Sequence, residues 1–102
     1  MSEDNEIRSL PQLDAALTAA TKRVDLLIKQ TPEANLFQGI KRQLEFIRGF
    51  VRARRVPSEE DRRRIIMGVQ ADREINDWDH PFAVQLMEID YAFRHWEELQ
   101  IK

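Results

Sequence analysis

The sequence predicts an all-α protein, a small up-down antiparallel bundle of about four helices. Three observations carry this prediction. Apolar residues recur every three or four positions through most of the chain, a proline stands near each boundary between these stretches, and one stretch is apolar around half of its circumference. A length of 102 residues suits one domain. We expect residues 1–9 to form a disordered N-terminus and residues 10–102 to form a single helical domain.

The first helix is expected to begin near Ser9 and to end near Gln30. Ser9 is a suitable N-cap, and Pro11 follows at a position where a missing backbone N–H costs nothing. Thr31 and Pro32 end the helix. Its apolar stripe consists of Leu13, Leu17, Ala20, Val24, Leu27 and Ile28.

The second helix, from Glu33 to about Val56, is predicted to be the centre of the bundle. Its apolar residues are Leu36, Phe37, Ile40, Leu44, Phe46, Ile47, Phe50 and Val51. They cover about half of a helical wheel, so the helix must contact neighbours on several sides. Gln43 falls inside this apolar sector and therefore needs a hydrogen-bond partner, because an unsatisfied buried amide costs about 1–3 kcal/mol.

The third helix is expected to begin after Pro57, with Ser58 as its N-cap and three acidic residues in its first turn. We expect it to bury Ile65, Ile66 and Val69. Polar residues then follow on the same face, so its C-terminal end is expected to leave the core.

The last helix should be capped by Asp79 or His80, with Pro81 in its first turn. Five large apolar residues are expected to face the core: Phe82, Leu86, Ile89, Phe93 and Trp96. The opposite side carries Val84, Met87, Glu88, Tyr91 and His95.

Charge is distributed unevenly along the chain, although the formal net charge is only −2. Residues 41–64 contain nine basic and four acidic residues, whereas residues 70–98 contain two basic and eight acidic residues. This balance disfavours nucleic-acid binding by bulk electrostatics. The N-terminal sequence MSEDNEIRSL lacks the basic and apolar segments of a signal peptide, and no stretch has the length of a membrane span. We therefore expect a cytoplasmic protein without membrane contact.

The sequence gives little support for catalysis. It has no cysteine, and its two histidines, His80 and His95, lack the spacing of a metal site, so we expect neither metal nor cofactor. Glu74 and Asp77 could act as acid and base only in a desolvated cleft. Neither histidine has the exposed mid-helix position of a phosphotransfer domain. The arginines of residues 52–64 are interrupted by acids and lack interleaved aromatic residues, so a solvated helix end is favoured over a phosphate site.

An acidic surface with exposed aromatic residues remains, and it is typical of a protein interface. Trp and Tyr are common interface anchors, and acidic neighbours accelerate association with a basic partner. The alternative is that Trp78 packs on its own helix and that Met87 and Tyr91 only touch the third helix. The candidate partner-binding residues are Glu74, Asp77, Trp78, Asp79, Met87, Glu88 and Tyr91.

Several short motifs in order resemble those of the type VI secretion immunity proteins that protect against NAD(P)-hydrolysing toxins. These motifs are KRQLEFIR at residues 41–48, Ile66-Met67-Gly68 leading to Glu74-Ile75, the segment from Asp79 to Pro81, and Tyr91. The resemblance covers about residues 13–91, and His80 looks like an insertion before Pro81.

The resemblance implies a small helical cytoplasmic protein, not an enzyme, that binds a cognate effector toxin domain and blocks its active site. The effector it implies is an NAD(P) glycohydrolase, with a nucleotide pyrophosphokinase as the alternative. Occlusion of a nucleotide site by the acidic surface fits this role, because such a site presents positive groups to phosphates. The competing interpretation is a helical adaptor or a self-associating module, including a homodimer, with no toxin partner.

Overall fold

The chain forms five α-helices and one short 3-10 helix in the computed structural model, which describes residues 7–100. The elements are α1 (Leu10–Gln30), α2 (Asn35–Ala53), α3 (Glu59–Arg63), α4 (Met67–Glu74), α5 (His80–Arg94) and η1 (Trp96–Glu98). Helices α3 and α4 together occupy the place of the predicted third helix. The prediction of a small up-down helical bundle is therefore confirmed.

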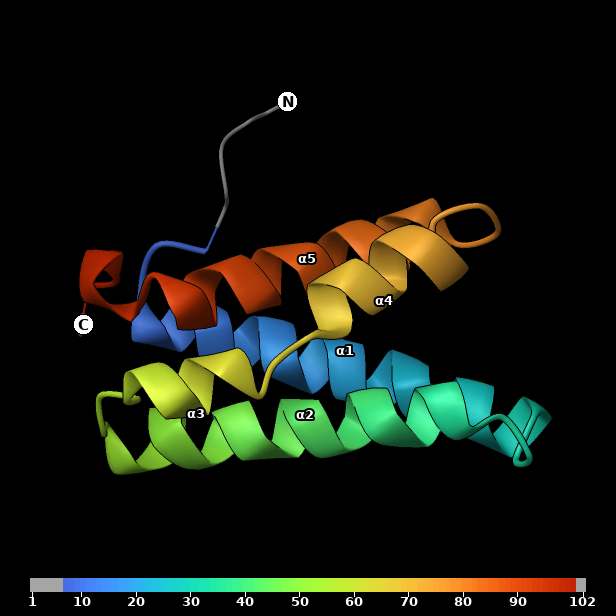
Figure 1. The fold of residues 1–102 in the computed structure, drawn as a ribbon, viewed down its shortest axis with the longest axis horizontal. Helices are drawn as coiled ribbons and strands as arrows, with labels where there is room; N and C mark the ends of the chain where they lie inside the picture. The colour runs from blue at the N-terminus through green and yellow to red at the C-terminus, as the bar shows by residue number, and fades with distance from the viewer. Residues whose placement is uncertain (1–6, 101–102) are drawn as a thin grey trace.

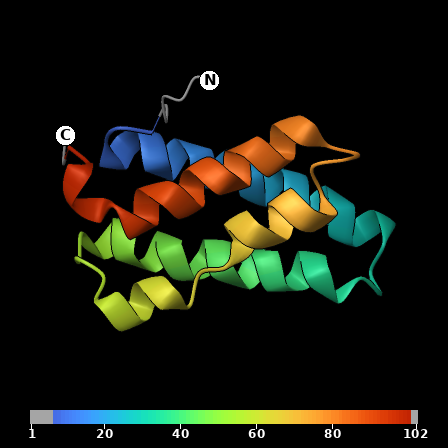
Figure 2. The ribbon, with the colours of Figure 1, turned by 45° about the horizontal axis from the view of Figure 1, so that its top comes forward.

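Helix α1 packs against α2 and α5, and α4 packs against α5 (Figures 1 and 2). The start of α1 and Gln100 lie at the same end of the bundle. There the Leu10 N–H donates to the Gln100 carbonyl at 2.8 Å, and the Gln100 N–H donates to the Arg8 carbonyl at 2.9 Å. Ile7 is buried beside them. Residues 1–6 of the expected disordered N-terminus lie outside the described residues.

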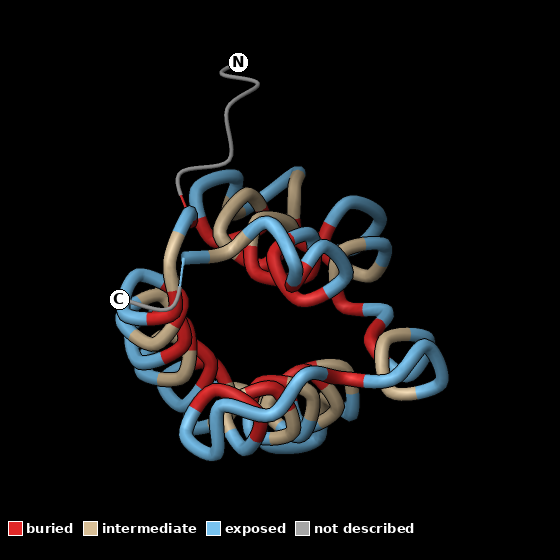
Figure 3. The backbone as a smooth tube through the Cα atoms, turned by 90° about the vertical axis from the view of Figure 1, so that its left-hand side faces the viewer, coloured by how far each residue is buried: buried red, intermediate tan, exposed pale blue. Residues whose placement is uncertain are grey.

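The buried residues of all the long helices face one common interior (Figure 3). On α2 these are Phe37, Ile40, Leu44, Ile47, Phe50 and Val51, while Leu36 and Phe46 are half-buried. The stripe predicted for the last helix is also buried, from Phe82 on α5 to Trp96 on η1. No helix within residues 7–100 combines the length and the apolar character that a membrane span requires.

The prediction of one continuous third helix was wrong. The helix is interrupted after Arg63, and α4 restarts at Met67 with a different face toward the core. Ile65 is buried as expected, but Ile66 and Val69 are about half exposed. The buried stripe of α4 consists of Met67, Ala71 and Ile75, so the C-terminal end of this helix stays in the core. The interruption shifts the helical phase. A helical wheel that treats the segment as one continuous helix therefore assigns the wrong residues to the core-facing side.

The expected partner of Gln43 lies at this interruption. The Gln43 side chain accepts a hydrogen bond from the Ile66 N–H at 2.7 Å and donates one to the Gln70 side chain at 2.9 Å. Ile66 is the N-cap residue of α4 and has no capping side chain of its own. Gln43 therefore supplies an acceptor that the helix start lacks, and it fixes α4 to α2.

The other side of α4 is fixed to α5 by a buried carboxylate. Asp90 is 5% exposed, and its Oδ2 accepts a hydrogen bond from the Gly68 N–H at 2.7 Å. Arg94 donates to the same carboxylate and to the Ile65 carbonyl, so the charge is paired. A Cβ atom on residue 68 would lie 2.8 Å from Asp90 Oδ2, which means that only glycine allows this close approach.

Candidate functional site

The turn between α4 and α5 presents the most exposed aromatic side chain of the predicted acidic surface. Trp78 is 52% exposed, yet its position is fixed. Its indole Nε1 donates to the Glu74 carbonyl at 2.7 Å, and its ring meets Phe37 of α2 edge-on, with ring centroids 6.0 Å apart. Asp77 and the Glu74 side chain are exposed beside it in the sequence. The turn thus offers a rigid indole flanked by carboxylates.

Asp79 has a structural role at this turn. Its Oδ1 accepts a hydrogen bond from the Phe82 N–H at 3.4 Å, so Asp79 is the N-cap of α5 as one of the two predicted alternatives. Its Oδ2 accepts from two nitrogens of Arg23 on α1, at 2.6 and 2.9 Å. Its side chain is 15% exposed. Asp79 therefore positions the turn and has little surface left for a partner.

The remaining candidate residues lie farther along α5. Met87 is half-buried and packs against the core, and Glu88 is also half-buried. Tyr91 is 45% exposed and stacks on His95, with ring centroids 4.1 Å apart. A helix rises about 1.5 Å per residue, which puts Tyr91 roughly 20 Å from the turn that holds Trp78. The structure brings Glu74, Asp77, Trp78 and Asp79 together but places Tyr91 apart from them.

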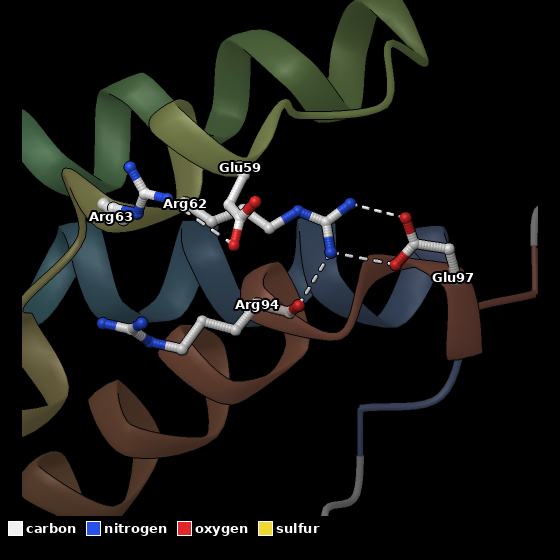
Figure 4. A pocket seen from close by; sticks show the side chains of 5 residues that line it. All are labelled: Glu59, Arg62, Arg63, Arg94 and Glu97. Carbon is white, nitrogen blue, oxygen red and sulfur yellow. Dashed lines mark hydrogen bonds and ion pairs between the residues drawn. The ribbon is translucent and has the colours of Figure 1, made fainter.

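The bundle also has a hollow, at the opposite end from Trp78. It measures about 460 Å³ and is lined by Glu59, Arg62, Arg63, Arg94 and Glu97 (Figure 4). Arg62 donates to the carbonyls of Arg94 and Pro57 and pairs with Glu97, at 2.9 Å from Nη1 to Oε1. This pairing lowers the pKa of Glu97 to about 2 and raises the pKa of Arg62. The donors of Arg62 are thus used within the structure, where they connect α3 to the end of α5.

Two partners of the candidate surface were missed by the sequence analysis. Phe37 supports the indole of Trp78, and Arg23 holds Asp79. Both come from helices distant in sequence, and neither has a local signal that singles it out. Among residues 7–100, no three His, Asp or Glu side chains converge as a metal site would require.

Comparison with known proteins gives one clear match. The family model named Tsi6 matches residues 8–95, which includes all five α-helices. Searches of curated proteins and of solved structures each returned no match. The matched region also contains the KRQLEFIR segment and the turn around Trp78, on which the resemblance to immunity proteins rested. The chain therefore belongs to the Tsi6 family of type VI secretion immunity proteins.

Proposed function

We propose that this immunity protein neutralises an NAD(P)-glycohydrolase effector by docking the turn around Trp78 over the effector's nucleotide site. The observation that carries the proposal is the fixed, half-exposed indole of Trp78, which follows the exposed acidic residues Glu74 and Asp77 in the same turn region. A nucleotide site is concave and presents basic groups to phosphates, so an aromatic side chain with flanking carboxylates complements it in shape and charge.

Rigidity supports Trp78 as the anchor of this interface. The hydrogen bond to the Glu74 carbonyl and the contact with Phe37 hold the indole in place before binding. A side chain that is already ordered loses less conformational entropy when it binds, which raises affinity. Asp79 contributes indirectly, because its bonds to Arg23 and to the start of α5 hold the turn in its conformation.

Met87, Glu88 and Tyr91 extend the proposed surface along α5. Tyr91 lies beyond the reach of a single small cleft that is centred on Trp78, given the roughly 20 Å between them, and Met87 and Glu88 are roughly 14 Å away. We assign all three to the rim of the interface, where a contact contributes less than an anchor at the centre. Occlusion by the Trp78 turn then excludes the dinucleotide from the effector without any chemistry by the immunity protein.

The test compares effector binding by three variants. Trp78→Ala should weaken binding by at least about 30-fold, the size expected for an aromatic anchor, whereas Tyr91→Ala should cost less than about 5-fold. Val56→Ala is the matched control, because Val56 is also well exposed but lies in the α2–α3 connection, at the opposite end of the bundle (Figure 1). Equal affinities of Trp78→Ala and Val56→Ala would remove Trp78 from the interface.

Charge is tested separately through the association rate. Replacing Glu74 and Asp77 with Lys should slow association and reverse its salt dependence, because both acids are exposed at the proposed contact. A control with Glu45 and Glu60 replaced by Lys changes the net charge equally at other sites. If both double variants slow association alike, only the overall charge matters.

A self-associating module would instead change size with concentration and leave effector turnover unaffected.

A further inference from the structure

Two arginines, Arg55 after the end of α2 and Arg64 at the end of α3, lie over aromatic rings of α2. The guanidinium carbon of Arg55 is 4.3 Å from the centroid of the Phe50 ring, and that of Arg64 is 4.5 Å from the centroid of the Phe46 ring. The two rings meet edge-on with centroids 5.2 Å apart. Two guanidinium groups are therefore held above neighbouring rings, and stacking leaves the N–H edges of a guanidinium available to a ligand.

The backbone at this junction adopts a conformation that usually requires glycine. Arg54 ends α2 with φ 53° and ψ 42°, and it is the only non-glycine residue with positive φ among those described. A side chain there costs about 1–2 kcal/mol. The Arg55 N–H donates back to the Phe50 carbonyl at 3.0 Å, so this turn returns Arg55 to the ring that it covers. Arg54 thus adds a third positive charge, next to Arg55 in the sequence, at a position that favours glycine.

These arginines differ from the neighbouring ones in their partners. Arg62 pairs with Glu97 and Arg63 contacts Glu59, but within residues 7–100 no ion pair is formed by Arg54, Arg55 or Arg64. Asp61 lies near enough for the charges of Arg55 and Arg64 to lower its pKa, but its Oδ2 accepts the Ser58 N–H as part of a capping box. Asp61 therefore offsets only part of the positive charge that the three arginines carry.

We propose that Arg54, Arg55 and Arg64, the arginine platform, bind a carboxylate-rich segment of a second protein partner. A guanidinium in a fixed plane binds a carboxylate through two parallel hydrogen bonds, and two such groups side by side fit two acidic residues. Nucleic acid fits less well. The faces of Phe46 and Phe50 are covered by the guanidinium groups, so no ring is left for base stacking, and Glu59, Glu60 and Asp61 follow directly in the chain.

The arginine platform lies away from the proposed effector surface. The α2–α3 connection and the α4–α5 turn lie at opposite ends of a molecule about 36 Å long (Figure 1). Both surfaces can therefore be occupied at once. The inference does not depend on which effector the Trp78 turn binds.

The test is a titration of the isotope-labelled protein, followed by NMR. The probe is a 12-residue peptide of alternating Glu and Gly, observed through the Arg Nε–Hε signals. The peptide should shift the signals of Arg55 and Arg64 before those of other arginines. Replacing both residues with Gln should reduce affinity at least tenfold, and replacing both with Lys should still reduce it several-fold, because Lys keeps the charge but loses the planar pair of donors.

The control variant replaces Arg42 and Arg73 with Gln, since both are exposed and the change in net charge is the same. Its affinity for the peptide should stay within twofold of that of the unaltered protein. Equal losses of peptide affinity in the platform variant and the control variant would overturn the proposal, as would the absence of peptide binding. Tighter binding of a 12-nucleotide oligouridylate or of inorganic pyrophosphate at the same arginines would also overturn it.

Discussion

Replacing Gly68 with Ala should destabilise the bundle, although Ala favours helices more than Gly does. The added Cβ would lie 2.8 Å from Asp90 Oδ2, 3.1 Å from its Cγ and 3.2 Å from its Cβ. Asp90 has little room to retreat, because it is 5% exposed and is held by Arg94. The substitution would therefore break the 2.7 Å bond from the Gly68 N–H to a buried carboxylate.

The expected size of the effect follows from three contributions. Losing a hydrogen bond to a charged group costs about 1.5–3 kcal/mol, and crowding a packed interior costs about 1–3 kcal/mol. Higher helix propensity returns about 1 kcal/mol, which leaves a net loss of about 1.5–5 kcal/mol. For a domain of this size, at about 4–8 °C per kcal/mol, that loss lowers Tm by roughly 6–40 °C.

Urea denaturation followed by circular dichroism measures this change, and the chain offers a matched control. Gly49 also lies inside a helix, but a Cβ there would meet nothing within 4 Å. Gly49→Ala should therefore raise the free energy of unfolding by up to about 1 kcal/mol. If Gly68→Ala is as stable as Gly49→Ala, the close contact between α4 and α5 does not exist as described.

Two further predictions concern the hydrogen bond and the ion pair that hold α3 and α4 to the rest of the bundle. Gln43→Ala should lower the free energy of unfolding by about 1–3 kcal/mol, because the Ile66 N–H loses its acceptor. The control is Gln38→Ala at an exposed site, which should lower the free energy of unfolding by less than about 1 kcal/mol in the same urea assay. The ion pair of Glu97 with Arg62 should make the stability of the protein depend on pH in the acidic range. The pKa of Glu97 falls from 4.5 to about 2 on folding, so its contribution is complete above about pH 4.5 and is lost as the pH drops through about 2. Glu97→Gln should therefore show a flatter fall in Tm between pH 4.5 and pH 2 than the unaltered protein, and identical slopes would contradict this.

Much of the fold could be predicted because its long helices carry their own signals. The stripes of α1, α2 and α5 are periodic and uninterrupted, and Ser9, Ser58 and Asp79 cap helices where the sequence indicated. The need of Gln43 for a partner was also predictable, since an amide within an apolar sector must be satisfied.

The interruption between α3 and α4 could not be predicted in the same way. No proline or glycine marks it at Arg64 to Ile66, and its hydrogen bonds come from Gln43 and Arg94, which are distant in sequence. An i,i+4 pair such as Asp90 and Arg94 usually lies on a solvated surface. Its burial here depends on the close approach of Gly68, which only the packed structure reveals.

The candidate surface was predicted only in part for a related reason. The sequence indicated Trp78 with its acidic neighbours, and helical spacing placed Tyr91 on the outer side of the last helix. It could not indicate that Asp79 is occupied by Arg23, because charge alone does not distinguish a paired carboxylate from an available one. The stacking of Arg55 and Arg64 on phenylalanine rings likewise depends on contacts that no spacing rule gives.

The most direct test of the proposed function is co-purification with the product of the adjacent reading frame, followed by assays of that product for NAD(P) and ATP consumption. We expect a stable complex in which NAD(P) hydrolysis is suppressed, and we expect Trp78→Ala to restore the hydrolysis. A neighbour that consumes NAD(P) at the same rate with and without this protein would contradict the proposal, and so would a complex whose inhibition is unaffected by changes at Trp78, Glu74 and Asp77.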